Sequence, residues 1–127
     1  MRPRVLVVDD RPDSWRTTRS ALEGRGLDVE HVSDGPSALD MLELRRPDVI
    51  LLQVGITPMG GMEVLDRIRS NPQHAGVPVI LMAASVADDD ALLEGYKFGA
   101  DYFLTTPCST RQLLHAMGLV LGREFPE

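Results

Sequence analysis

Several apolar runs in this chain of 127 residues stop abruptly at side chains that could do chemistry. Residues 5–8 run into Asp9 and Asp10, and residues 49–52 run into Gln53. Continuous apolar runs are typical of buried strands in parallel sheets, and active sites lie beyond the carboxyl ends of such strands. The adjacent carboxylates could hold Mg²⁺, or they could simply cap backbone and pair with the arginine that follows them. Gln53 stands where a reactive side chain is expected, so its neutral amide needs an explanation.

Two more apolar runs lead to the same edge. Residues 77–82 end at Ala83, and residues 100–104 end before Thr106. Residues 27–32 instead alternate between apolar and polar, which is typical of a strand near the edge of a sheet. Helical patterns follow the strands, with starts expected at Trp15 after a Ser14 cap, after Asp34, before Val64, after Asp88, and after Ser109 or Thr110. Five strands alternating with five helices indicate an open parallel α/β sheet with helices on both faces.

Length and composition predict one domain over residues 1–127, with its core in residues 4–122. No apolar run approaches the roughly 18 residues of a membrane span, so we expect no membrane contact. A single cysteine, Cys108, fits a cytoplasmic location. The net charge of −6 argues against direct binding of nucleic acid. Lys97 is the only lysine beside twelve arginines, which leaves few candidates for a lysine role.

Taken together, the ordered motifs resemble the receiver domains of two-component response regulators (CheY-like), from Val5 to about Leu121. The matching stretches are residues 5–10, 47–52, 59–65, 77–80 and 99–104 with Pro107. Each stretch alone is weakly informative, but all of them in order at these spacings are specific. The resemblance implies a flavodoxin-like, three-layer α/β/α fold whose five-stranded parallel sheet has the order 2-1-3-4-5.

In that family an aspartate ending the third strand accepts a phosphoryl group from a histidine kinase. A Thr or Ser after the fourth strand and a Lys after the fifth contact the phosphoryl oxygens. Matched position by position, the acceptor is Gln53, the Thr/Ser position is Ala83 and the Lys position is Thr106. An amide cannot form an acyl phosphate, and neither replacement supplies the missing hydroxyl or charge. The resemblance therefore predicts that the usual catalytic set is absent.

The family also holds Mg²⁺ through two acids and a backbone carbonyl, which match Asp9, Asp10 and Gly55. With one carboxylate fewer, we expect no required cofactor and only weak Mg²⁺ binding. The resemblance implies that Phe103 is the aromatic switch residue, with Tyr102 pointing to the opposite side of its strand. Leu119 lies off the apolar stripe of the last helix and is expected at an interaction surface.

We therefore expect a receiver-like module of phosphorelay signalling that is not an enzyme and is not phosphorylated at Gln53. The expected partners are a histidine kinase, a phosphotransfer protein, an output protein, or a second copy through the fourth helix, fifth strand and fifth helix. One alternative is phosphorylation of a neighbour such as Asp9, Asp10 or Thr57 with Mg²⁺. Another is a small-ligand site of the flavodoxin type, disfavoured because no glycine-rich loop follows residues 5–8.

Overall fold

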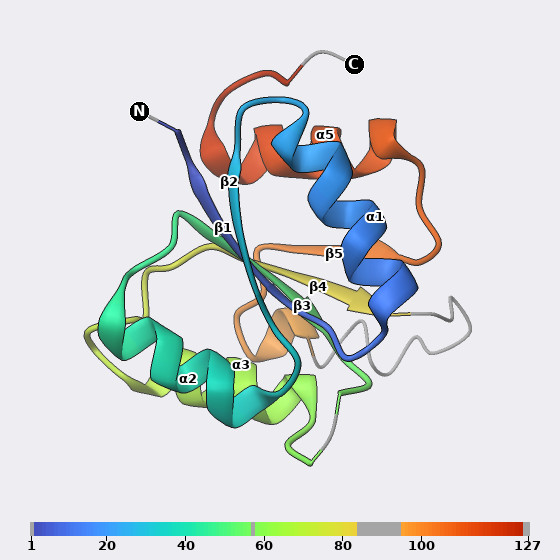
Figure 1. Cartoon of the computed structure of the whole chain (residues 1–127). Helices are drawn as coiled ribbons and strands as arrows, with labels where there is room; N and C mark the ends of the chain where they lie inside the picture. The colour runs from blue at the N-terminus through green and yellow to red at the C-terminus, as the bar shows by residue number, and fades with distance from the viewer. Residues whose placement is uncertain (1, 57, 84–94, 126–127) are drawn as a thin grey trace.

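The computed structural model describes residues 2–56, 58–83 and 95–125, and their framework is a five-stranded sheet (Figure 1). The strands are β1 (Arg4–Val8), β2 (Asp28–Val32), β3 (Val49–Gln53), β4 (Val79–Ala83) and β5 (Tyr102–Thr105). Their order is β2-β1-β3-β4-β5, and every neighbouring pair is parallel. The predicted fold and strand order are confirmed, with the alternating segment at the sheet edge.

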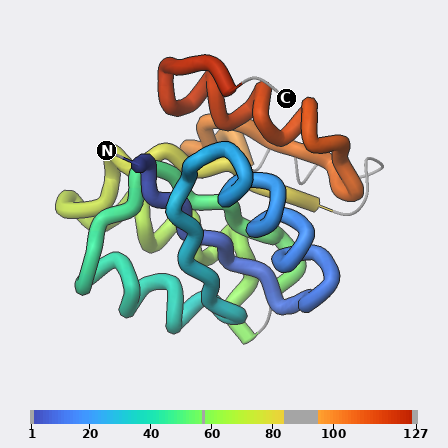
Figure 2. Tube along the Cα trace, turned by 45° about the horizontal axis from the view of Figure 1, so that its top comes forward, coloured from blue at the N-terminus to red at the C-terminus, as the bar shows by residue number. Residues whose placement is uncertain are grey.

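Helices cover both faces of the sheet. They are α1 (Pro12–Glu23), α2 (Gly35–Leu44), α3 (Gly61–Ser70) and α5 (Thr110–Leu121). Figures 1 and 2 show α1 and α5 side by side on one face, with α2 and α3 on the other. The helix predicted after Asp88 falls mostly outside the described residues, although residues 95–97 are helical and Gly99 follows with a φ of 98°. None of the helices described is long and apolar enough to cross a membrane.

Alternation along the central strands produces two cores. Val5, Val7 and Leu51 pack with residues of α1 and α5, whereas Leu6 and Leu52 pack with residues of α2 and α3. These side chains are at most 3% exposed, and full burial of each such side chain is worth roughly 1.5–3 kcal/mol. The strands read as unbroken apolar runs because both of their faces are covered.

The first residues of the helices show which local sequence signals determine where each helix begins. Helix α1 begins at Pro12 rather than at Trp15, because the fixed φ of proline suits the first helical position. Ser14 therefore lies inside the first turn, and Arg11 is the N-cap without a side-chain capping bond. The predicted caps of α2 and α5 are confirmed: the Asp34 carboxylate accepts from the Ser37 backbone N–H at 2.7 Å, and Ser109 forms a capping box. The cap predicted at Asp88 lies outside the described residues.

The start of α3 approaches the end of β3 very closely. A Cβ atom added at Gly61 would lie 2.5 Å from the Gln53 carbonyl oxygen. The Gly61 backbone N–H also donates to the Val54 carbonyl oxygen at 3.0 Å. Only glycine permits this contact, so Gly61 fixes the backbone just beyond Gln53.

Candidate functional site

The sheet brings the predicted site residues to one edge. Asp9 follows β1, Gln53 ends β3 and Ala83 ends β4, and these strands are neighbours in that order. Thr106 follows β5, and its backbone N–H donates to the Ala83 carbonyl oxygen at 2.7 Å. Parallel strands have their carboxyl ends at the same side of a sheet. The four positions singled out in the sequence therefore meet at one place.

Gln53 is buried at this edge, with 5% of its surface exposed. Its Oε1 atom lies 3.4 Å from a terminal guanidinium nitrogen of Arg11. The opposite amide orientation would turn two donors toward each other, so the oxygen belongs on the Arg11 side. Within the described residues its Nε2 atom is buried without a hydrogen-bond partner. The residue at the end of β3 is therefore a neutral acceptor held by a cation of the same chain.

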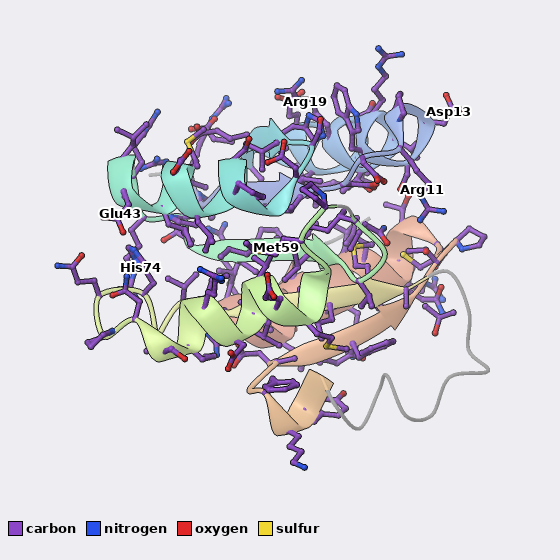
Figure 3. The ribbon with its side chains drawn as sticks, turned by 90° about the horizontal axis from the view of Figure 1, so that it is seen from below. Arg11, Asp13, Arg19, Glu43, Met59 and His74 are labelled. Atoms are coloured by element: carbon purple, nitrogen blue, oxygen red, sulfur yellow. The ribbon has the colours of Figure 1, made fainter. Side chains whose placement is uncertain are left out.

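The acid pair is split between two environments. Asp9 is 2% exposed, whereas Asp10 is exposed to solvent. The Asp9 Oδ1 atom accepts from the Arg11 backbone N–H at 3.0 Å and lies 4.0 Å from the Arg11 Nε atom. The simpler alternative considered from the sequence, backbone capping plus pairing with Arg11, describes this geometry. Figure 3 shows Arg11 at the start of α1, near the carboxyl ends of the strands.

A divalent cation fits this arrangement poorly. The Asp9 Oδ1 and Gln53 Oε1 atoms both face the Arg11 side chain. Across residues 2–56, 58–83 and 95–125, no three His, Cys, Asp or Glu side chains gather as a metal site would require. Weak Mg²⁺ binding through Asp9, Asp10 and the Gly55 carbonyl stays a prediction.

The positions matched to the family's phosphoryl contacts lack the hydroxyl and the lysine expected there. Ala83 has no hydroxyl, and Thr106 carries no charge. The Thr106 Oγ1 atom is buried and finds no partner in the described part of the chain. A groove of about 660 Å³ lies beside them, lined in part by Arg11, Thr106 and Cys108. Burial raises the pKa of the Cys108 thiol, which disfavours the reactive thiolate.

The residues expected in switching and interaction occupy distinct surroundings. Phe103 is partly buried against the core beneath α2 and α3, and Tyr102 is partly buried against the core beneath α1 and α5. The prediction that the two rings point to opposite sides of β5 is therefore confirmed. Leu119 is 57% exposed on α5, while Leu113, Leu114 and Met117 of the same helix are buried.

Sequence reasoning missed a cluster of side chains from β2 and α1 that contacts the Asp9 backbone through His31. The His31 Nε2 atom lies 2.7 Å from the Asp9 carbonyl oxygen and must donate its proton there. The His31 ring stacks on Trp15 with centroids 3.9 Å apart, and the Arg16 and Arg19 guanidinium groups lie over the same indole. An isolated histidine in an alternating strand gives no signal of such a stack. The adjacency of Arg11 to the acid pair did signal its contact with Asp9.

Comparison with known proteins agrees with this fold. The model of the response regulator receiver domain family matches residues 5–118. The probable transcriptional regulatory protein TcrX of Mycobacterium tuberculosis is 34% identical over 119 residues, which are 94% of this chain and 50% of that protein. The DNA-binding response regulator MtrA of Mycolicibacterium smegmatis is 33% identical over 127 residues, covering 100% of this chain and 54% of that protein.

A solved structure of the chemotaxis protein CheY4 of Vibrio cholerae superposes with a TM-score of 0.89 at 28% identity, covering 95% of this chain and 100% of that one. The chain belongs to the receiver domain family of two-component response regulators. It spans about half the length of the curated relatives it matches.

These relatives overturn one expectation. The predicted partners were proteins only, with no direct nucleic acid, yet MtrA is named a DNA-binding response regulator and TcrX a transcriptional regulatory protein. The expectation was wrong because it generalised from a net charge of −6. That charge describes the 127 residues of the receiver part and carries no information about the other half of proteins such as these.

Proposed function

We propose that this chain is a receiver domain that works in two-component signalling without phosphorylation of residue 53, passing its signal on through contacts instead. The observation that supports this most directly is Gln53 at the end of β3, buried and turned toward Arg11. An acyl phosphate requires a carboxylate nucleophile, and an amide oxygen cannot replace it.

The remaining positions support the same proposal. Phosphoryl transfer depends on cations and hydrogen bonds that stabilise negative charge as it spreads over the transferred group. Ala83 donates no hydrogen bond from its side chain, and Thr106 brings no positive charge. Arg11 is the cation nearest to Gln53 among the contacts described here, and it is already engaged with Asp9. Among the described residues, this edge therefore presents neither the usual nucleophile at residue 53 nor an unengaged cation beside it.

We further propose that the signal ends in the control of transcription. The support is the naming of MtrA and TcrX, both of which align with at least 94% of this chain. The DNA contact would be made by another part of the same protein or by a protein that the receiver controls. A cytoplasmic location, predicted from the sequence, would accompany this role and is open to a fractionation experiment.

Intact-mass spectrometry after incubation with acetyl phosphate and Mg²⁺ tests the proposal. We expect no phosphoryl adduct on the wild-type protein or on Gln53→Asn, and an adduct on Gln53→Asp. If the single variant gains none, Gln53→Asp combined with Thr106→Lys supplies the lysine that the family uses.

A stable adduct on the wild-type protein would contradict the proposal. Peptide mapping of that adduct to Asp9, Asp10 or Thr57 would support the alternative in which a neighbour accepts the phosphoryl group. Of these, Asp10 is exposed, Asp9 is buried against Arg11, and Thr57 lies outside the described residues.

The groove of about 660 Å³ beside the site favours the third function considered, binding of a small ligand. A thermal-shift screen against nucleotides and flavins tests it. A reproducible rise in melting temperature that is lost in Arg11→Ala would support a ligand in this groove.

A further inference from the structure

Arg11 contacts both polar side chains at the centre of the site. Its side-chain nitrogens lie 4.0 Å from Asp9 Oδ1 and 3.4 Å from Gln53 Oε1. Asp9 follows β1 and Gln53 ends β3, which are neighbouring strands. The guanidinium therefore lies between two strand ends and occupies the space beside the Asp9 and Gln53 oxygens that a metal at this edge would approach.

Burial of Asp9 favours a cation at this position. The Asp9 side chain is 3% exposed, and a buried carboxylate without a partner is strongly unfavourable. The Arg11 side chain is 52% exposed, so its stem can lie along the protein while its charge stays in contact with water. Water screens the attraction, so the pair adds little to stability by itself. Its consequence is local: the charge of Asp9 has a counter-ion within the chain.

The backbone keeps this cation in place. Arg11 is the N-cap of α1, and its N–H donates to Asp9 Oδ1 at 3.0 Å. His31 holds the Asp9 carbonyl oxygen from the other side at 2.7 Å. Pro12 restricts the backbone directly after Arg11. Only the side-chain torsions of Arg11 can therefore carry the guanidinium away from the site.

We infer that the Arg11 guanidinium is the built-in cation of this site, replacing a divalent metal between Asp9 and Gln53. The inference rests on the proposed function, because an acceptor that is neutral at residue 53 leaves a single positive charge sufficient for the buried acid. Asp9, Asp10 and Arg11 together carry a formal charge of −1, whereas the two acids alone carry −2. A dication thus meets both a weaker attraction and an occupied position.

A magnesium titration of the wild-type protein and Arg11→Ala tests this inference. Binding is measured by calorimetry and by the fluorescence of Trp15, the only tryptophan, which is stacked on the histidine that holds Asp9. We expect Arg11→Ala to bind Mg²⁺ roughly thirtyfold more tightly, the factor that Coulomb's law in a water-like dielectric gives for removing one charge at contact distance from a dication.

Two further variants sharpen the comparison. Arg16→Ala removes one charge from the same helix without touching Asp9 or Gln53. Because Arg16 lies over the Trp15 indole, calorimetry is the readout for this variant, and its Mg²⁺ affinity should stay within about twofold of wild type. Arg11→Lys keeps the charge and should also bind weakly. Equal affinity of the wild type and Arg11→Ala would overturn the inference, as would an equal gain in Arg16→Ala. Circular dichroism checks that each variant is folded.

The titration contains no phosphoryl donor, so its outcome is separate from that of the proposed function. A phosphoryl adduct on the wild-type protein would overturn the proposed function even if Arg11→Ala gained Mg²⁺. Equal Mg²⁺ affinity would overturn the role of Arg11 even if the wild-type protein formed no adduct.

Discussion

At the scale of single residues, three polar side chains of the site have buried atoms and differ in how far their hydrogen-bonding groups find partners. Asp9 has backbone and arginine partners, while the Gln53 amide is only half satisfied, with Oε1 facing Arg11 and Nε2 lacking a partner among the described residues. Thr106 keeps a buried hydroxyl without a partner in the same described part. Unpaired buried donors cost about 1–3 kcal/mol each. Such a cost is typical of a place where the sequence serves function rather than stability.

We predict that Gln53→Leu leaves the fold intact and raises the free energy of unfolding by about 1 kcal/mol. Leucine has a similar volume and removes the unpaired amide nitrogen, while Arg11 remains half in water and loses little. Urea denaturation monitored by circular dichroism measures the change. Gln73→Leu, at an exposed position, serves as the control and should change stability by less than about 0.5 kcal/mol. A loss of stability in Gln53→Leu would show that the amide is fully satisfied.

At the scale of elements, the ends of strands and helices hold the site in shape. Strand β3 delivers Gln53, the start of α3 presses on its carbonyl, and the N-cap of α1 supplies Arg11. The sequence predicted the strands and the caps of α2 and α5 well, because apolar runs and capping residues are local signals. It missed the start of α1, where a proline overrode the serine two residues later.

The contact between α3 and β3 predicts a sharp difference between two glycines. In Gly61→Ala the new methyl group would meet the Gln53 carbonyl oxygen at 2.5 Å, so we expect a loss of about 2–3 kcal/mol in unfolding free energy. Gly55→Ala is the matched control, because nothing lies within 4 Å of its Cβ position. Chemical denaturation measures both variants. Equal stabilities would show that α3 does not press on the end of β3.

The cap of α2 predicts a pH dependence. Hydrogen bonds from the Ser37 backbone N–H and then from its side chain lower the pKa of Asp34 below the ordinary 3.8. A carboxyl with a lower pKa in the folded state stabilises the fold above its ordinary pKa, and this contribution is lost as the pH falls through the lowered value. Asp34→Ala should therefore be less stable than wild type at neutral pH, with the difference shrinking below about pH 4.

Urea unfolding at neutral pH and at several acidic values measures this difference. Asp40→Ala, an exposed position on the same helix, is the control for general charge effects. A gap between wild type and Asp34→Ala that stays constant with pH would contradict the capping role of the ionised carboxyl.

At the scale of the whole molecule, the framework is that of a receiver domain. The open parallel sheet and the meeting of Asp9, Gln53, Ala83 and Thr106 could be predicted from strand periodicity and parallel connection rules. The strand order came from the resemblance to receiver domains, and the structure confirms it. The bridge from Arg11 to Gln53 and the stack of His31 on Trp15 could not be predicted, because they depend on side chains from different elements meeting in space.

The prediction that the partners are proteins only was wrong, because it relied on the net charge of these residues alone. The net charge describes only these 127 residues. The effect of the signal depends on the larger signalling system, and the name of MtrA, a DNA-binding response regulator, points to DNA as a target in such a system. The fold and the site therefore indicate the chemistry available at the strand ends, but they do not identify the target of the signal.

The most direct test of the central claim is an NMR titration of the wild-type protein with beryllofluoride and Mg²⁺, which together mimic a phosphorylated aspartate. A neutral Gln53 with a built-in arginine predicts no shifts of backbone resonances at the carboxyl ends of the strands, whereas Gln53→Asp should respond. Shifts throughout the site of the wild-type protein would contradict the claim, because they would show a working phosphoryl pocket.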